Sequence, residues 1–263
     1  MTGILDEIVE YKRAFVKECK KRLPLRELED CISSSGKPRG FTQALRGKGC
    51  ALIAEIKTAS PSKGIIRDDV SVVEIARLYE ENGASCISVL TDERYFGGSL
   101  ERLSLVRNIS AIPLLRKDFI IDAYQIFEAR YAGADAVLLI AAILDNDELG
   151  EFIERASLLG MDSLVEVHDD EEMRRIRALN TPLVGINNRN LRTFETDLSV
   201  TARLASQAPH GAILVSESGI HNAGDVRTVH RMGAHAVLVG EAIMRERDIS
   251  IKVRELSNAV REH

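Results

Sequence analysis

Short apolar runs recur along the chain and are separated by amphipathic or polar segments. Each run is hydrophobic almost throughout, which is typical of strands covered on both faces in a parallel sheet, because half-exposed strands alternate with polar residues. Parallel strands need crossover helices, and the segments between the runs are long enough to supply them. The eight runs cover residues 50–56, 86–91, 112–116, 136–140, 163–168, 183–187, 213–217 and 236–240.

Helix signals fill the first of these crossovers. Residues 71–82 begin with the capping box Ser71-x-x-Glu74 and are followed by Gly83, a residue type that commonly ends helices. A Gly-Ala pair precedes the second, fourth and eighth runs, each time shortly before the strand begins. The separations between these pairs are multiples of a βα unit of about 25 residues, so the pattern indicates a repeated βα unit.

The number of strands distinguishes two architectures. A (β/α)8 TIM barrel has eight parallel strands and takes about 250 residues, which fits the length of 263. A doubly wound open sheet is the alternative, but no G-x-G-x-x-G sequence opens a helix after the first run. We therefore predict an α/β fold, a single (β/α)8-barrel domain over residues 1–263. Residues 1–48 are predicted to be an N-terminal helical extension packed on the barrel, with Ile4 and Ile8 in an apolar stripe and Pro24 opening a second helix.

The amino-acid composition excludes some classes of binding partner. The formal net charge of −5 and the pI near 5.8 give no general attraction to nucleic acid or to an anionic membrane surface. No stretch reaches the ~18 apolar residues of a membrane span, and the four cysteines lack a C-x-x-C spacing. We expect a cytoplasmic protein in a reducing compartment that binds neither nucleic acid nor membrane. The sequence does not reveal the oligomeric state, since the predicted outer helix faces are ordinary and no long apolar patch stands out; a monomer is favoured.

Polar side chains cluster where the predicted strands end. Strand alternation places Glu55 and Lys57 on the same face of the first run, beyond Ile53. The same position in later runs holds Lys117, Glu166, Asn187 and Glu217. Charges are costly to bring next to an apolar interior, and the carboxyl ends of barrel strands are where active sites form. We predict that these six side chains form a catalytic ring.

The chemistry of this ring is acid–base. Three carboxylates and two amines can hold one another at shifted pKa values suited to proton transfer. No serine lies in G-x-S-x-G, and the six histidines show no H-E-x-x-H or other metal-binding spacing. We expect catalysis without a metal or another cofactor.

Two further features surround the predicted ring. The polar loop 60–64 after the first run is suited to a mobile lid over the barrel mouth. The pairs Ser218-Gly219 and Gly240-Glu241 end the seventh and eighth runs, where barrels often bind phosphate through backbone N–H groups. Together the two pairs indicate a small phosphorylated ligand.

These residues resemble the indole-3-glycerol-phosphate synthase family of tryptophan biosynthesis, along nearly the whole chain. The motifs that carry the resemblance are E-I-K-T-A-S-P-S-K-G at 55–64, L-R-K-D-F at 115–119, L-V-E-V-H at 164–168, G-I-N-N-R-N-L at 185–191 and S-E-S-G-I at 216–220. The resemblance implies a cofactor-free reaction, in which 1-(2-carboxyphenylamino)-1-deoxyribulose 5-phosphate, a phosphorylated anthranilate-derived substrate, becomes indole-3-glycerol phosphate and loses carbon dioxide and water.

The resemblance also implies roles for single residues. Lys117 would protonate the ketone oxygen during ring closure, and Glu166 with the Glu55–Lys57 pair would supply the base and acid for dehydration, in a division that stays open. Asn187 and Glu217 would orient the sugar hydroxyls.

The same resemblance outlines the binding pocket. Arg189 and Ser60 would lie near the anthranilate end, and the apolar slot for its ring would be made by Pro61, Phe96, Phe119 and Leu138. The residues expected around the phosphate are Lys57, Ser218, Gly219, Gly240 and Glu241. Some relatives have serine in place of Glu241. Since a carboxylate cannot donate a hydrogen bond to phosphate, only the backbone N–H at 241 is a credible ligand.

Two other readings remain. Another phosphate-binding barrel, such as the sugar isomerase that precedes this step in the same pathway, should lack the Glu55–Lys57 and Lys117 constellation. A non-catalytic barrel that binds a ligand or serves as a scaffold would not need intact acid–base residues.

Overall fold

Eight parallel strands close into a barrel in the computed structural model, which describes residues 3–33, 36–47, 49–60, 64–65, 67, 71–179, 181–191 and 193–260. The barrel closes because β1 pairs with both β4 and β10. The strands, in their order around the barrel, are β1 (Ala51–Ile56), β10 (Ala236–Val239), β9 (Ile213–Glu217), β8 (Leu183–Asn187), β7 (Asp162–Val167), β6 (Ala136–Ile140), β5 (Leu114–Lys117) and β4 (Cys86–Leu90). The predicted (β/α)8 fold is confirmed, and each predicted run overlaps one strand to within two residues at either end.

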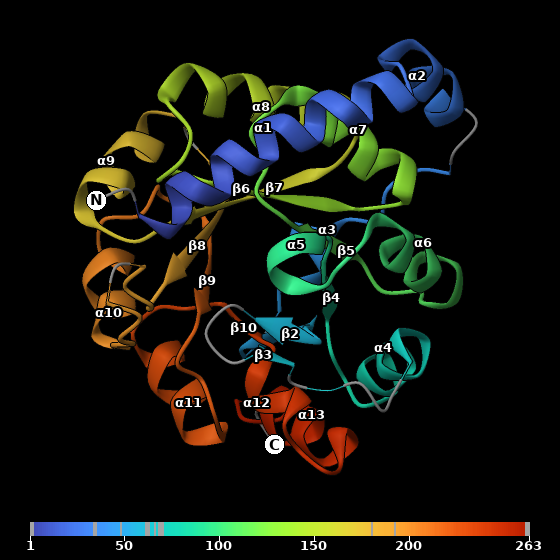
Figure 1. The fold of residues 1–263 in the computed structure, drawn as a ribbon. Helices are drawn as coiled ribbons and strands as arrows, with labels where there is room; N and C mark the ends of the chain where they lie inside the picture. The colour runs from blue at the N-terminus through green and yellow to red at the C-terminus, as the bar shows by residue number, and fades with distance from the viewer. Residues whose placement is uncertain are drawn as a thin grey trace.

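Helices follow the strands and surround the barrel (Figure 1). The capping box predicted at Ser71 and Glu74 is present at the start of the first of them, and Gly83 adopts a left-handed φ of 97° just after its end. The helices are α4 (Val72–Glu81), α5 (Glu93–Phe96), α6 (Leu100–Ile109), α7 (Ala123–Ala132), α8 (Asn146–Leu158), α9 (Asp170–Ala178), α10 (Ser199–Ala205), α11 (Ala223–Arg231), α12 (Glu241–Met244) and α13 (Ile249–Ser257). A small antiparallel pair, β2 (Ala59–Ser60) and β3 (Gly64–Ile65), lies in the loop after β1.

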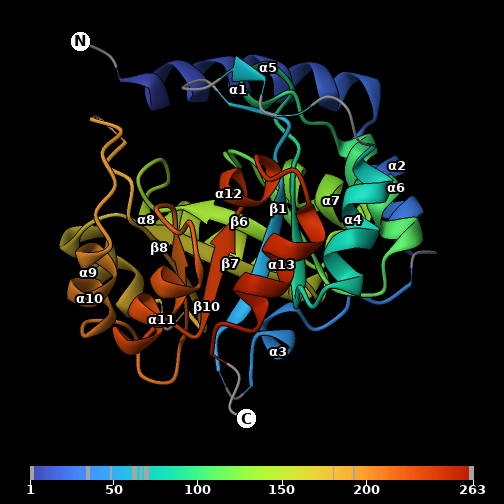
Figure 2. The ribbon, with the colours of Figure 1, turned by 90° about the horizontal axis from the view of Figure 1, so that it is seen from below.

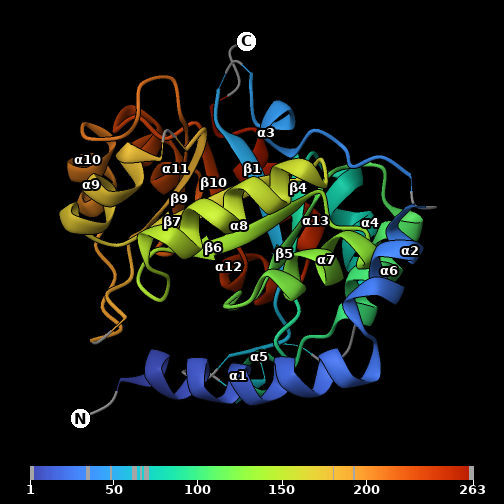
Figure 3. The ribbon, with the colours of Figure 1, turned by 90° about the horizontal axis from the view of Figure 1, so that it is seen from above.

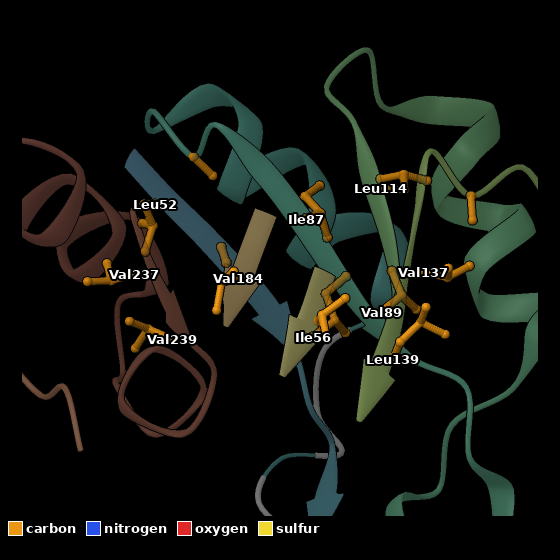
Figure 4. Packing of buried hydrophobic residues seen from close by; sticks show 14 of the residues in the cluster. Leu52, Ile56, Ile87, Val89, Leu114, Val137, Leu139, Val184, Val237 and Val239 are labelled. Carbon is orange, nitrogen blue, oxygen red and sulfur yellow. The ribbon is translucent and has the colours of Figure 1, made fainter. Parts of the chain in front are cut away.

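Alternation along each strand divides the core into two layers. On β1, Leu52 and Ile56 belong to the layer between strands and helices (Figure 4), whereas Ile53 belongs to a second cluster inside the barrel. On β5 the neighbours Leu114 and Leu115 divide between the layers in the same way. The interior cluster packs the lower part of the barrel, so the polar residues that follow on the same strand faces lie above an apolar floor.

Among the described residues, three helices precede β1 in the predicted N-terminal extension: two near the predicted positions and a third that the sequence did not predict. They are α1 (Ile4–Arg22), α2 (Leu25–Ser33) and α3 (Phe41–Ala44). Figures 2 and 3 show α1 lying across one end of the barrel, with α3 at the opposite end. Phe41 and Leu45 join the interior cluster, so the α3 segment plugs the end where the strands begin. No helix among the described residues is long and apolar enough to cross a membrane.

Candidate active site

A cavity of about 220 Å³ opens at the carboxyl ends of the strands. Its floor and walls include all six side chains of the predicted ring, which lie on β1, β5, β7, β8 and β9 or directly after β1. Its roof is the first helix, which contributes Ile4, Leu5 and Ile8. The N-terminal extension therefore encloses the candidate site, a position that its apolar stripe alone did not predict.

Lys117 lies at the centre of the ring. Its Nζ is 3.4 Å from Oε2 of Glu166 and 3.5 Å from Oε2 of Glu217, and its side chain is 17% exposed. Burial alone would lower the pKa of Lys117, but the surrounding carboxylates, Glu166 first among them, outweigh burial and raise it above the ordinary lysine value. The ammonium is therefore charged, faces the cavity and can donate a proton to a bound oxygen atom.

Glu166 is buried between cations and amide donors. Its Oε1 accepts a hydrogen bond from Nδ2 of Asn187 at 3.2 Å and lies 3.2 Å from Nε2 of His168. Burial would raise the pKa of Glu166, but Lys117 and then His168 outweigh it and hold the pKa far below the ordinary range. This carboxyl is ionised and acts as an acceptor only.

Glu217 has the opposite protonation preference, although it contacts the same ammonium. Burial raises the pKa of Glu217 well above its ordinary value, and the negative charge of Glu166 adds to the rise against the opposing charge of Lys117. Its Oε1 is buried without a hydrogen-bond partner among the described residues. A Cβ at Gly185 would collide with that oxygen, which explains the glycine in an otherwise bulky strand.

Glu55 and Lys57 lie on the opposite side of the mouth. Ser88 Oγ lies 3.5 Å from Oε2 of the buried Glu55, and the bare face of Gly240 leaves room for the carboxylate. The Nζ of Lys57 lies 5.2 Å from the ring centre of Phe96. Burial lowers the pKa of Lys57, and Glu55 opposes that shift. A lysine in this position is better prepared than a solvated one to exchange a proton.

Three of the four residues predicted for an aromatic slot line the cavity. Phe96 and Phe119 pack with their ring centres 6.1 Å apart, and both line the cavity together with the buried Leu138. Arg189 also lines it, and its backbone N–H donates to Oδ1 of Asn187 at 3.0 Å. Pro61 lies outside the described residues, as does the side chain of Ser60, so neither is placed against the cavity.

The residues predicted around a phosphate lie together on the same cavity. Ser218 and Gly219 both have left-handed φ angles, of 66° and 79°, so the chain turns sharply as it leaves β9. Gly240 and Glu241 open the short helix α12 beside this turn. The Glu241 carboxylate lies 3.0 Å from Nε of Arg245, one helical turn further on, which leaves the backbone N–H as the group available to an anion.

Several residues of the site were not predicted from the sequence. The cavity is also lined by Ile4, Leu5, Ile8, Leu191, Phe194 and His221. His168 does not line the cavity but contacts Glu166, and its place in the L-V-E-V-H motif was a signal, since it lies two residues from Glu166 on the same strand face. No group of three or more metal-ligating side chains is arranged to hold a metal ion in the part of the chain that the structure describes.

Solved structures share this fold at low sequence identity. The chain superposes on a 3-hexulose-6-phosphate synthase with a TM-score of 0.65 at 17% identity, covering 80% of this chain and 100% of that one. It superposes on a chain of the tryptophan synthase complex from Pyrococcus furiosus with a TM-score of 0.59 at 18% identity, covering 80% and 98%. These similarities show the barrel fold alone.

Sequence comparisons are more specific. The chain is 48% identical to an indole-3-glycerol phosphate synthase of Prochlorococcus marinus subsp. pastoris, over 98% of this chain and 90% of that protein. It is 48% identical to the enzyme of that name from Albidiferax ferrireducens, over 97% and 98%, and 46% identical to that from Acetivibrio thermocellus, over 96% and 98%. A family profile described as Indole-3-glycerol phosphate synthase matches residues 5–256. The chain therefore belongs to the indole-3-glycerol phosphate synthase family.

Proposed function

We propose that this chain converts 1-(2-carboxyphenylamino)-1-deoxyribulose 5-phosphate into indole-3-glycerol phosphate, with release of carbon dioxide and water, as a carboxy-lyase of tryptophan biosynthesis. The observation that carries the proposal is the ammonium of Lys117, held 3.4 Å from Glu166 and 3.5 Å from Glu217 inside a roofed cavity. Neither a sugar isomerase nor a binding barrel needs this arrangement together with the Glu55–Lys57 pair.

Ring closure is the first chemical step. The ring carbon that bears the carboxylate attacks the ketone carbon, and the carbonyl electron pair moves onto oxygen. Lys117 donates its proton to that oxygen, so a hydroxyl forms instead of an alkoxide. Burial of the site strengthens this electrostatic assistance, because the Lys117 side chain is only 17% exposed and solvent screens its ammonium weakly.

Two eliminations complete the reaction. The carbon–carboxylate bond breaks as carbon dioxide leaves, and its electron pair restores part of the aromatic system. The new hydroxyl then leaves as water, which needs a proton on oxygen and loss of a proton from the adjacent carbon. Glu166, ionised by its surroundings, suits the base, and Lys57, whose pKa burial lowers, suits the acid, with Glu55 beside it.

The remaining residues bind and orient the substrate. Phe96, Phe119 and Leu138 line the cavity as an apolar surface for the aromatic ring, with Arg189 toward its carboxylate. Asn187 and Glu217 orient the sugar hydroxyls. In this proposal the phosphate is bound by backbone N–H groups of Ser218, Gly219, Gly240 and Glu241 together with the ammonium of Lys57.

The wider setting is part of the proposal. We infer that residues 1–263 act as one catalytic domain, as a monomer in the cytoplasm and without a cofactor. The net charge of −5 supports the absence of a nucleic-acid or membrane partner.

The experiment that tests the function uses the purified protein. Incubation with the carboxyphenylamino substrate should produce indole fluorescence, both with and without a chelator. Activity that disappears with the chelator would contradict the cofactor-free proposal. In a parallel reaction, the substrate of the alternative isomerase, phosphoribosylanthranilate, should not be consumed. Its isomerisation would favour the isomerase hypothesis. Substrate binding without any turnover would instead favour a binding barrel.

A further inference from the structure

His168 occupies a position between two carboxylates just beyond the end of β7. Its Nε2 lies 3.2 Å from Oε1 of Glu166, and its Nδ1 lies 3.1 Å from Oε2 of Glu172. The side chain is 13% exposed and does not line the cavity. The ring therefore contacts the candidate base without itself lining the cavity.

The local chain geometry fixes this arrangement. Asp169 caps α9 by accepting hydrogen bonds from the backbone N–H groups of Glu171 and Glu172, so the helix begins at Asp170, two residues after the histidine. The Glu172 side chain then reaches back and accepts a 2.7 Å hydrogen bond from the backbone N–H of His168 as well as contacting its ring. One carboxylate thus orients both the backbone and the imidazole.

The charges around the imidazole favour its protonated form. Two ionisable groups face the imidazole, Glu166 on β7 and Glu172 on α9. Beyond Glu166 lie Lys117 on β5 and Glu217 on β9. Burial alone would lower the pKa of His168, but the two carboxylates that face its ring nitrogens outweigh burial and raise it to about 10. An imidazolium therefore faces one oxygen of Glu166 and an ammonium faces the other.

We propose that His168 is a positioning residue that fixes the Glu166 carboxylate, in place and in its ionised form, between Lys117 and Asn187, and that Glu172 orients His168 for this role. This inference rests on the proposed function, because the base role of Glu166 comes from it. His168 does not line the cavity, so in this proposal it acts through Glu166.

The test compares pH profiles of kcat for His168→Gln, Glu172→Gln and a control, His230→Gln. His230 lies in the last turn of α11, where its ring contacts the carbonyl of Ala234, and it does not line the cavity. For His168→Gln we expect kcat to fall on the order of tenfold to a hundredfold, with KM nearly unchanged. The acidic limb of its kcat profile should move up by about one to three pH units, because Glu166 loses an adjacent cation. Glu172→Gln should move the acidic limb in the same direction by a smaller amount. Because this variant retains the imidazole of His168, it still tests the proposal if His168→Gln does not fold.

The outcomes separate the two proposals. Wild-type protein without turnover contradicts the proposed function. An active wild type with the acidic limb unmoved in both variants overturns the role of His168, even if kcat falls, because a purely structural residue would lower kcat without moving the limb.

Discussion

Lys12 on α1 forms a buried ion pair with Asp118, the residue that directly follows Lys117: Nζ and Oδ1 are 2.6 Å apart. The same ammonium lies 2.9 Å from Oδ2 of Asp92, and Asp118 also contacts Arg116 on β5 at 3.1 Å. Burial would lower the pKa of Lys12, but the two aspartates outweigh it and raise the pKa. The roof helix is thereby joined to the strand end that carries the central lysine.

Removal of the Lys12 amine should loosen the packing of α1 over the cavity. Lys12→Met leaves the buried Asp92 without the cation that it pairs with and leaves Asp118 with its ion pair to Arg116, so we expect the free energy of unfolding to fall by about 3–5 kcal/mol. KM should rise because Ile4, Leu5 and Ile8 no longer hold their places over the cavity. Urea denaturation and steady-state kinetics measure the two effects.

A neighbouring lysine offers a matched control. Lys20 pairs with Asp122 at 2.6 Å, but its side chain is 46% exposed. Lys20→Met should therefore cost less than about 1 kcal/mol and leave KM unchanged. Equal effects of the two substitutions would show that the buried pair has no special role.

Lys117→Ala should abolish ring closure. Loss of the proton donor is expected to lower kcat on the order of 10²–10⁴-fold, as measured by indole fluorescence. Since the lysine also pairs with the ionised Glu166, the variant should melt at a lower temperature than wild type while keeping its circular dichroism spectrum. Turnover close to the wild-type rate would remove Lys117 from the mechanism.

The sequence predicted the six-residue ring more completely than the residues around it. Strand alternation was sufficient to predict that Glu55, Glu166 and Glu217 share one face of the barrel, because the period of two is a local property of strands. The stripe on α1 predicted an apolar contact but not which surface it covers, which depends on packing between distant elements. The protonation of Glu166 and Glu217 was equally out of reach, because it depends on distances between charges from different strands.

The two glutamates beside Lys117 should respond differently to the same substitution. Glu166→Gln removes an ionised base and should lower kcat at neutral pH on the order of 10²–10⁴-fold. Glu217→Gln replaces a carboxyl whose pKa is raised with a neutral side chain of the same shape, and it should cost less than about tenfold. Single-turnover measurements on both variants test this order, and a larger loss in Glu217→Gln would reverse the assignment.

The imidazolium of His168 should also appear in the stability of the folded chain. Its pKa is raised from 6.5 to about 10 on folding, so its stabilisation is fully present below about pH 6.5 and is lost as the pH rises through about 10. The difference in unfolding free energy between wild type and His168→Gln should therefore be largest at pH 6, smaller at pH 8 and smallest above pH 10. Urea titrations at these pH values measure it without any turnover. A difference that stays constant with pH would mean that the histidine is neutral in the folded protein. Lys117 would then be the cation that keeps Glu166 ionised.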